Sequence, residues 1–525
     1  MALLNKAEPA NLALAVAGVG IILFVVGRAF YSLFLHPLRS FPGPLLCRIS
    51  SLPFVYWLVR AKLPYKIKDL HDKYGSVVRI RPNELSFGSP EAWTDIYGHR
   101  KAGAAEFAKY GTFFKTVPDE AHNIIMSTRE EHRGLRRALA HGFSERSLRS
   151  QEPIIGAYVD LLIQRLRDNS AGGAQPVNMR EWLNWTTFDV IGELGFGSAF
   201  GCLKNSDYHP WVRLITDNIR IGAWVLSMNY LGLQPLVRLM VKAGGMRSRD
   251  KQLAMVSAKL AQRMESGAER PDFIDGLIKQ KDSLHLSFGE LVRNAEVLIV
   301  AGSESTSTLL SGAIYLLTTH PDKLARVTEE VRAAFTSEEE ITLNSVSSLS
   351  YMLACLNETL RYYPPVASAL PRQAPKGGAY VEGKFVPEDT VVAVWQWAIN
   401  HNPKYWTEPT SYAPERFLGD PRYKGDRVEA MQPFSTGPRK CLGQMLAYAQ
   451  MRLILAKIVW NFDMVLEDDS KDWLKTQPVY ILWDRPPLNL RLRPARKRKV
   501  NISKASSGKP AFSDDSASSG KSYTA

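Results

Sequence analysis

Cysteine, arginine and glycine stand at fixed spacing in one segment of the chain, Phe434–Gly443, whose pattern is F-x-x-G-x-R-x-C-x-G. These five fixed positions are matched in roughly one random sequence of this length in ten thousand. A cysteine that binds a metal must be a thiolate, shielded from water and faced by backbone N–H donors. Gly437 and Gly443 allow a tight loop around Cys441, and the helix that follows brings its positive end near the sulfur. The segment therefore suits a thiolate metal ligand.

This segment closely resembles the signature of the cytochrome P-450 superfamily, the haem-thiolate monooxygenases. The resemblance implies a haem cofactor whose iron is bound by Cys441, with Arg439 directed at a haem propionate and Phe434 covering the thiolate. It covers roughly residues 30–490 and is greatest to membrane-bound fungal enzymes of secondary metabolism, such as trichothecene-type hydroxylases. The expected fold is the cytochrome P-450 fold, mainly helical with small β-sheets.

A second motif, E-x-x-R, consists of Glu358 and Arg361 in an apolar helical segment. Both ionic groups face a core there and need partners. In the family resembled, the third partner is the arginine of a P-E-R-F segment, which is Arg416 in this sequence. The expectation is a buried Glu358–Arg361–Arg416 cluster that holds the cysteine loop and is structural rather than catalytic.

The segment Ala301–Thr306 resembles the family's oxygen-activation motif, A/G-G-x-D/E-T-T/S, and falls midway along a long helix. The resemblance implies that Gly302 opens a groove for dioxygen and that Glu304 and a neighbouring hydroxyl relay protons. Ser305 occupies the usual threonine position, so either Ser305 or Thr306 provides the hydroxyl.

Three further basic residues match positions at which the family contacts haem propionates. His132 and Arg136 stand four apart on one face of a helix, and Arg372 follows a Leu-Pro pair. Each alone is an ordinary surface charge, and the interpretation as propionate ligands depends on the set.

The sequence contains no G-x-G-x-x-G dinucleotide fingerprint, so electrons must come from a separate protein. By resemblance this is an NADPH–cytochrome P-450 reductase in the same membrane, and Arg133, Arg137 and Lys440 are expected to form the cationic surface that attracts it. The implied reaction inserts one oxygen atom from O2 into a hydrophobic small molecule. A non-catalytic haem-thiolate gas sensor and a haem-free, membrane-tethered interaction protein are the alternatives, and Glu304 beside two hydroxyls favours the enzyme.

The elements that position these residues are mostly long helices. A capping box at Ser287 starts a helix that continues to Thr319, and other helices end near Pro364 and begin near Gly443. Short β-branched runs at residues 76–81 and 390–394 predict strands. Apolar segments expected to line a substrate pocket are residues 113–114, 297–301, 365–370 and 480–482.

The first 35 residues read as a membrane anchor, because Leu12–Leu35 is apolar apart from Arg28 and long enough to span a bilayer. A cleaved signal peptide is the alternative. Arginines after the span place the catalytic domain in the cytosol, at the endoplasmic reticulum. The expected order is an anchor (1–35), a proline-rich hinge (36–44), the haem domain (45–493) and a disordered basic tail (494–525).

Composition limits the remaining classes. Of 525 residues, 45% are hydrophobic and 22% charged, which excludes collagen-like and wholly low-complexity chains. Four cysteines without a CxxC pair exclude a disulfide scaffold and disfavour structural zinc. About half of the net charge of +14 lies in the last 35 residues, so we expect no nucleic-acid partner.

Overall fold

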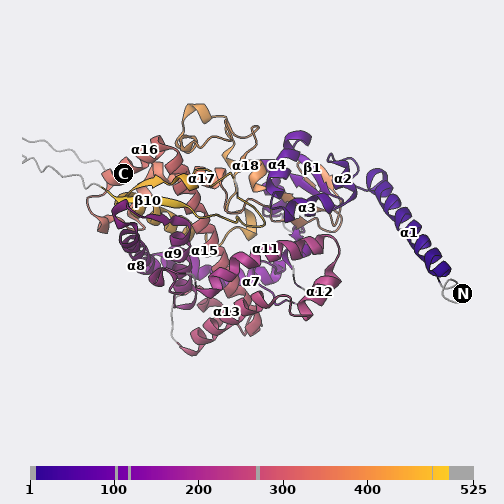
Figure 1. The fold of residues 1–525 in the computed structure, drawn as a ribbon, viewed down its shortest axis with the longest axis horizontal. Coiled ribbons are helices and arrows are strands. Elements are labelled where there is room, and N and C mark those ends of the chain that lie inside the picture. Colours follow the sequence, from indigo (N-terminus) through magenta and orange to yellow (C-terminus); the bar gives the residue numbers. More distant parts are fainter. Residues whose placement is uncertain are drawn as a thin grey trace, which may run out of the picture. The chain divides into compact units, whose positions relative to one another are not determined.

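Helices dominate the computed structural model and three small sheets accompany them (Figure 1). The structure describes residues 7–100, 104–115, 117, 120–207, 209–267, 272–475 and 477–495. The predicted tail falls outside these residues from position 496 onward. The helices are α1 (Ala7–Phe30), α2 (Leu45–Ile49), α3 (Leu52–Val59), α4 (Leu63–Tyr74), α5 (Pro90–Tyr97), α6 (Gly111–Phe114), α7 (Arg129–Ala140), α8 (Glu145–Ser170), α9 (Met179–Phe196), α10 (Cys202–Asn205), α11 (Pro210–Tyr230), α12 (Gln234–Lys242), α13 (Arg247–Glu265), α14 (Asp275–Lys279), α15 (Phe288–Thr319), α16 (Pro321–Ala334), α17 (Ser350–Tyr362), α18 (Gln396–Asn400) and α19 (Gln444–Asn461).

The largest sheet has the strand order β1-β2-β8-β5-β3, a second has β4-β10-β9, and β6 and β7 form a hairpin. β2 and β8 run parallel, whereas the other neighbours are antiparallel. The strands are β1 (Val77–Arg81), β2 (Glu84–Phe87), β3 (Ala108–Lys109), β4 (Pro176–Asn178), β5 (Arg372–Gln373), β6 (Ala379–Val381), β7 (Lys384–Val386), β8 (Val391–Val394), β9 (Phe462–Leu466) and β10 (Asn489–Pro494). The predicted strands at 76–81 and 390–394 are thus present, as is the mainly helical fold.

Helix α15 passes through the main hydrophobic core and packs against α9, α17 and α19. Its N-terminus has the predicted capping box, in which Ser287 and Glu290 each bond the other's backbone N–H. A Cβ at Gly312 would lie 2.3 Å from the Tyr363 ring, so glycine allows the chain after α17 to approach closely. The helix is therefore held along its length, which fixes the residues midway along it.

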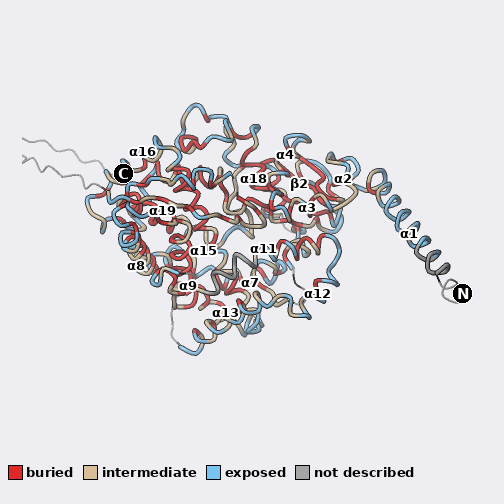
Figure 2. The backbone as a smooth tube through the Cα atoms, in the orientation of Figure 1, coloured by how far each residue is buried: buried red, intermediate tan, exposed pale blue. Residues whose placement is uncertain are grey.

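The N-terminal helix differs from α15 in its exposure (Figure 2). Ala15–Leu35 is long and apolar enough to cross a membrane, with a mean hydropathy of 2.0, and it is almost wholly uncovered by protein. This fits a single membrane anchor. α15 meets the same test of length and composition, but it is largely buried in the core.

The proline-rich segment 36–44 is not helical, as its prolines predict. It packs on the sheet, since Arg79 N–H donates to the Pro42 carbonyl at 2.7 Å. The Arg79 guanidinium also bonds the backbone and the hydroxyl of Ser32, each at 2.9 Å. The connection from α1 to the body is therefore docked against β1.

Candidate active site

The cysteine loop depends on close contact with α5. Gly437 has φ +74°, and a Cβ there would lie 2.0 Å from the Tyr97 carbonyl oxygen, so a side chain does not fit. Gly443 has an ordinary φ of −88°, and α19 begins directly after it. Of the two glycines expected to allow a tight loop, only Gly437 is therefore at a position where the structure requires glycine.

Cys441 is exposed at the end of this loop, whereas the other three cysteines of the chain are buried. Its backbone N–H donates to the Phe434 carbonyl at 2.8 Å, and the Phe434 ring packs 5.3 Å from the Tyr448 ring. Desolvation by the surrounding protein raises the pKa of the Cys441 thiol, while the Gly443 N–H and the Arg136 guanidinium lower it. A stable thiolate therefore needs a further positive partner, and a bound metal ion is such a partner.

A cavity of about 450 Å³ lies beside the loop, between α7 and the end of α5. Three of the predicted propionate ligands, His132, Arg136 and Arg439, line it. Arg136 also donates to the Lys440 carbonyl at 2.7 Å, which ties α7 to the cysteine loop. The fourth, Arg372, does not line this cavity: it is buried on β5, with its guanidinium 5.4 Å from the centre of the Tyr97 ring.

Five basic side chains lie close enough together that their charges lower the pKa of several members, and we call them the cation cluster: Lys109, His132, Arg136, Arg372 and Arg439. Burial and the other four members lower the pKa of His132 to about 4. Burial and Arg439 lower the pKa of Arg372 to about 10. Burial, Arg372 and Arg439 hold the pKa of Lys109 well below its usual range. The cluster therefore favours any ligand that brings negative charge.

The cation cluster has few internal partners. Among the described residues, Glu106 is the only carboxylate that forms an ion pair with it, at 3.0 Å from Arg439. The Nε atoms of Arg372 and Arg439 are buried and make no hydrogen bond to any described residue. Buried cations with unfilled donors suit a ligand that carries carboxylates, as haem does in its propionates. Together with Cys441, the donor set fits haem.

The middle of α15 is open on one face. Ala301 is exposed and Ser305 is partly exposed, whereas Glu304 and Thr306 are buried. Residues four apart lie on one helix face, and the Ser305 hydroxyl donates to the Ala301 carbonyl at 2.6 Å. The Thr306 hydroxyl donates to the Gly302 carbonyl at 3.0 Å. Of the two candidate hydroxyls, Ser305 is therefore the one on the open face.

Glu304 is paired inside the core rather than with a hydroxyl. Its carboxylate accepts a hydrogen bond from Arg485 at 2.9 Å, and the same Arg485 nitrogen also donates to Asn184 and Ser307. In the described part of the chain, no hydrogen bond joins Glu304 to the Ser305 hydroxyl. Although Glu304 and Ser305 are neighbours in the sequence, their side chains have different hydrogen-bond partners. The proton relay through Glu304 therefore stays a prediction.

Gly302 does not form the predicted groove. A Cβ at this position would lie 2.9 Å from the Ile191 side chain of α9. The expectation that this glycine opens space for dioxygen is therefore wrong on steric grounds. Its lack of a side chain instead lets α9 pack closely against α15.

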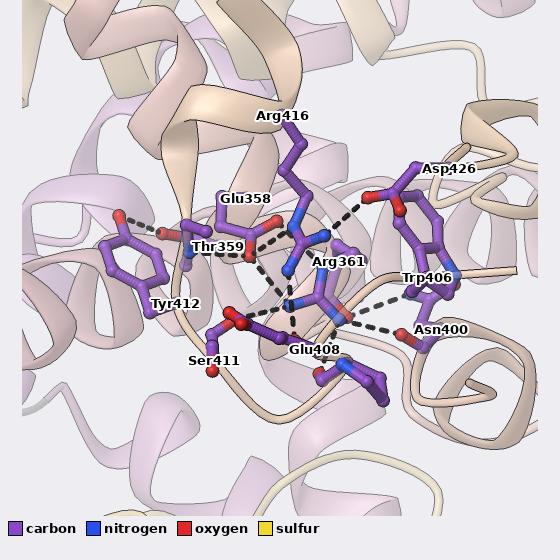
Figure 3. Close-up of polar contacts among 12 residues, drawn as sticks. Glu358, Thr359, Arg361, Asn400, Trp406, Glu408, Ser411, Tyr412, Arg416 and Asp426 are labelled. Atoms are coloured by element: carbon purple, nitrogen blue, oxygen red, sulfur yellow. Dashed lines mark hydrogen bonds and ion pairs between the residues drawn. The ribbon is translucent and has the colours of Figure 1, made fainter. Parts of the chain in front are cut away.

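Glu358, Arg361 and Arg416 are in contact, as Figure 3 shows. Arg361 donates to the Glu358 carboxylate at 2.8 and 2.7 Å, and Arg416 donates to it at 3.1 Å. Asp426 pairs with Arg416, and all four ionic side chains are almost completely buried. Within this Glu358 cluster (Glu358, Arg361, Arg416, Asp426), two cations thus meet two carboxylates.

The Glu358 cluster also binds backbone. Arg361 donates to the carbonyls of Asn400, Pro409 and Ser411 at 2.8, 2.8 and 2.9 Å, and the Ala413 N–H donates to Glu358 at 2.9 Å. These bonds fasten residues 400–426 to α17. The cluster therefore acts on the segment that leads into the cysteine loop.

Comparison with known proteins agrees with this geometry. The cytochrome P-450 family matches residues 43–492. The chain is 45% identical to the trichothecene C-15 hydroxylase of Fusarium sporotrichioides over 487 residues, which are 92% of this chain and 98% of that protein. The chain belongs to the cytochrome P-450 family. It is also 47% identical over 486 residues to the cytochrome P-450 monooxygenase tpeC of Talaromyces stipitatus (91% and 94% covered) and 41% identical over 493 residues to the averantin hydroxylase of Dothistroma septosporum (93% of each).

Membership makes this cytochrome P-450 a monooxygenase with haem, bound through a cysteine thiolate, as its cofactor. The relatives are monooxygenases and hydroxylases, so the gas-sensor alternative is not supported. Enzymes of this family use redox partners and hydrophobic substrates. When bound, haem supplies the iron centre that activates oxygen.

Three residues of these sites were not predicted: Lys109 in the cation cluster, Asp426 in the Glu358 cluster and Arg485 beside Glu304. Lys109 stands in no motif, and of its neighbours 107–110 only Phe107 is buried, so no local pattern marks it. Arg485 lies 181 positions from Glu304, and no local pattern links them. Only the tertiary structure brings these charges together.

Proposed function

We propose that this cytochrome P-450 inserts one oxygen atom from O2 into a hydrophobic intermediate of fungal secondary metabolism, with electrons from NADPH through a separate reductase. The products are the oxygenated substrate and water, since two electrons and two protons reduce the second oxygen atom. The observation that carries the proposal is the Cys441 loop, tied by Arg136 to a cavity in whose lining basic side chains outnumber the one carboxylate, Glu106. The names of two relatives, a trichothecene C-15 hydroxylase and an averantin hydroxylase, support hydroxylation of such a secondary metabolite.

Each residue has an assigned part in this proposal. Cys441 binds the iron, Gly437 shapes its loop and Phe434 shields it. His132, Arg136, Arg372 and Arg439 hold the propionates, and we add Lys109 to this set because it belongs to the same cation cluster.

Ser305 is assigned the hydroxyl that orients a proton donor on the open face of α15, and Thr306 is assigned to the packing of the helix. Glu304, fixed by Arg485, is a proton source only if this ion pair opens. The structural role of the Glu358 cluster is to hold residues 400–426 in place.

The reductase and the membrane have distinct sites in this proposal. Arg133, Arg137 and Lys440 are exposed at the cavity mouth and beside Cys441, where an acidic flavoprotein is steered by their charge. Residues 1–35 anchor the chain in the endoplasmic reticulum membrane, and residues 36–44 connect the anchor to a cytosolic haem domain, residues 45–493. The tail, 494–525, has no assigned role.

The proposal is tested by expressing the full chain with an NADPH–cytochrome P-450 reductase in microsomes supplied with 18O2 and candidate terpenoid and polyketide precursors. Mass spectrometry should find a product that carries one 18O atom. Ser305→Ala should increase NADPH consumption without product, whereas Thr306→Val should leave the two coupled. Product formation without 18O incorporation contradicts the function, and equal uncoupling in both variants contradicts the choice of Ser305.

A further inference from the structure

A second cavity lies apart from the cation cluster and shares no lining residue with the first. Its volume is about 20 Å³, enough for a group the size of one water molecule. Helices α3 and α11, strand β2 and the loops at 368–371 and 480–481 surround it. Three of the segments predicted from sequence to line a substrate pocket meet at this point. Its apolar wall consists of Phe54, Leu58, Leu63, Phe113, Leu226 and Ile481.

One donor in this wall has no partner. Trp395 lines the cavity with 5% of its surface exposed, and its indole Nε1 is buried without a hydrogen bond to any residue that the structure describes. Other buried indoles, those of Trp93, Trp406 and Trp483, each donate to a backbone carbonyl at 2.7–3.1 Å. A buried unpaired N–H is unfavourable, so the Trp395 donor points to a ligand acceptor.

The same wall contains a free acceptor. Glu84 is 1% exposed, and both contacts from Arg81, at 2.6 and 2.5 Å, go to its Oε2 atom. In the described part of the chain, Glu84 Oε1 makes no hydrogen bond. The Arg81 guanidinium is covered by the rings of Tyr230 and Phe54, whose centroids lie 4.1 and 5.2 Å away. The ion pair is therefore fixed and neutral overall, with one carboxylate oxygen left to accept.

We propose that this cavity is a recognition subsite for a hydroxyl group on the hydrophobic substrate, which accepts from Trp395 Nε1 and donates to Glu84 Oε1. The proposal rests on the monooxygenase function proposed above. A ketone or ether oxygen has no proton for Glu84, and a charged group has no counter-ion in this apolar wall because Arg81 already neutralises Glu84. The volume admits the hydroxyl while the rest of the substrate lies outside.

The test uses the haem-loaded full chain and two probes that differ by one hydroxyl, 1-adamantanol and adamantane. Equilibrium dialysis compares wild type, Trp395→Phe and the control Trp224→Phe, which changes an exposed tryptophan of α11. Each probe partitions into detergent equally in all samples, so proteins are compared for one probe at a time. Trp395→Phe should raise the Kd of 1-adamantanol about tenfold and that of adamantane less than twofold, and the control should change neither.

Equal weakening of both probes, or no change in either, would mean that Trp395 serves packing only and overturns the subsite. A second comparison needs no variant, once each Kd is corrected for the partition of that probe into detergent in protein-free samples: 1-methoxyadamantane cannot donate to Glu84, so wild type should bind it about tenfold more weakly than 1-adamantanol. Equal binding overturns the role of Glu84. The carbon-monoxide spectrum of the same preparation tests the haem-thiolate assignment separately, because dialysis measures binding without turnover.

Discussion

The two buried charge clusters of this enzyme differ in how their charges are balanced. In the Glu358 cluster, Arg361 and Arg416 meet Glu358 and Asp426, and backbone carbonyls take the remaining guanidinium protons. In the cation cluster, Arg439 is the one of the five basic side chains that forms an ion pair with a carboxylate among the described residues, and its partner is Glu106. Both are rich in arginine, so composition alone does not separate them.

The difference in balance indicates a difference in role. A cluster whose charges and donors are all satisfied within the chain stabilises the fold and leaves nothing to bind. A cluster with unfilled arginine Nε atoms and mutually lowered pKa values is completed by an anionic ligand. The predictions below test this contrast.

The largest effect is expected from Glu358→Ala, which leaves Arg361 and Arg416 buried with only Asp426 between them. Breaking such a buried pair costs about 3–5 kcal/mol of unfolding free energy. The unfolding temperature and the haem content of the purified enzyme should both fall. Glu429→Ala removes an exposed partner of Arg427 and should cost less than about 1 kcal/mol. Equal losses in the two variants would contradict the structural role.

Arg439→Ala should weaken haem binding without loss of the fold. The lost charge-assisted hydrogen bond is worth about 1.5–3 kcal/mol, or roughly a 10- to 100-fold lower haem affinity. The change removes both the repulsion among the cations and the ion pair with Glu106, so the unfolding temperature of the haem-free chain should change little. Haem titration and calorimetry measure the two quantities, with the exposed Arg146→Ala as control. A lower unfolding temperature without a lower haem affinity would mean that Arg439 stabilises the fold rather than binds haem, which would contradict the contrast between the clusters.

His132 should make the haem-free enzyme sensitive to acid. Its pKa is about 4 in the folded chain against 6.5 in the unfolded chain, so only the unfolded chain binds this proton between those values. The stability contribution is complete above pH 6.5 and is lost as the pH falls toward 4, by about 2 kcal/mol at pH 5. His132→Gln should flatten that part of the unfolding curve. His401, with a pKa of about 3, acts in the same direction and remains in the variant. An unchanged curve would remove His132 from the cation cluster.

Lys109→Met should have the smallest effect. Lys109 is only partly buried, with its ammonium 4.2 Å from the Phe114 ring, so it should contribute about 0.5–1 kcal/mol to haem binding. Haem titration should show a two- to fivefold loss of affinity. The matched Lys115→Met substitution, on an exposed residue nearby, should show none. Identical affinities in the two variants would confine the cluster to the four residues predicted from sequence.

Sequence patterns predicted the parts of the fold that local physics determines. The Ser287 capping box and Pro321 bound α15, and the spacing around Cys441 defines its loop. Contacts between distant segments could not be predicted from the sequence. For example, nothing near Glu304 indicates that Arg485 neutralises it. The role of Gly302 was misjudged for the same reason, since the Ile191 side chain that excludes a Cβ belongs to another helix.

The central claim is that Cys441 is the iron ligand, and the carbon-monoxide spectrum of the reduced enzyme tests it most directly. Wild type should show the Soret band typical of thiolate-ligated haem. Cys441→Ala should lose that band, while Cys355→Ala, which changes a buried cysteine, should keep it. A Cys441→Ala enzyme with the wild-type spectrum would contradict the account.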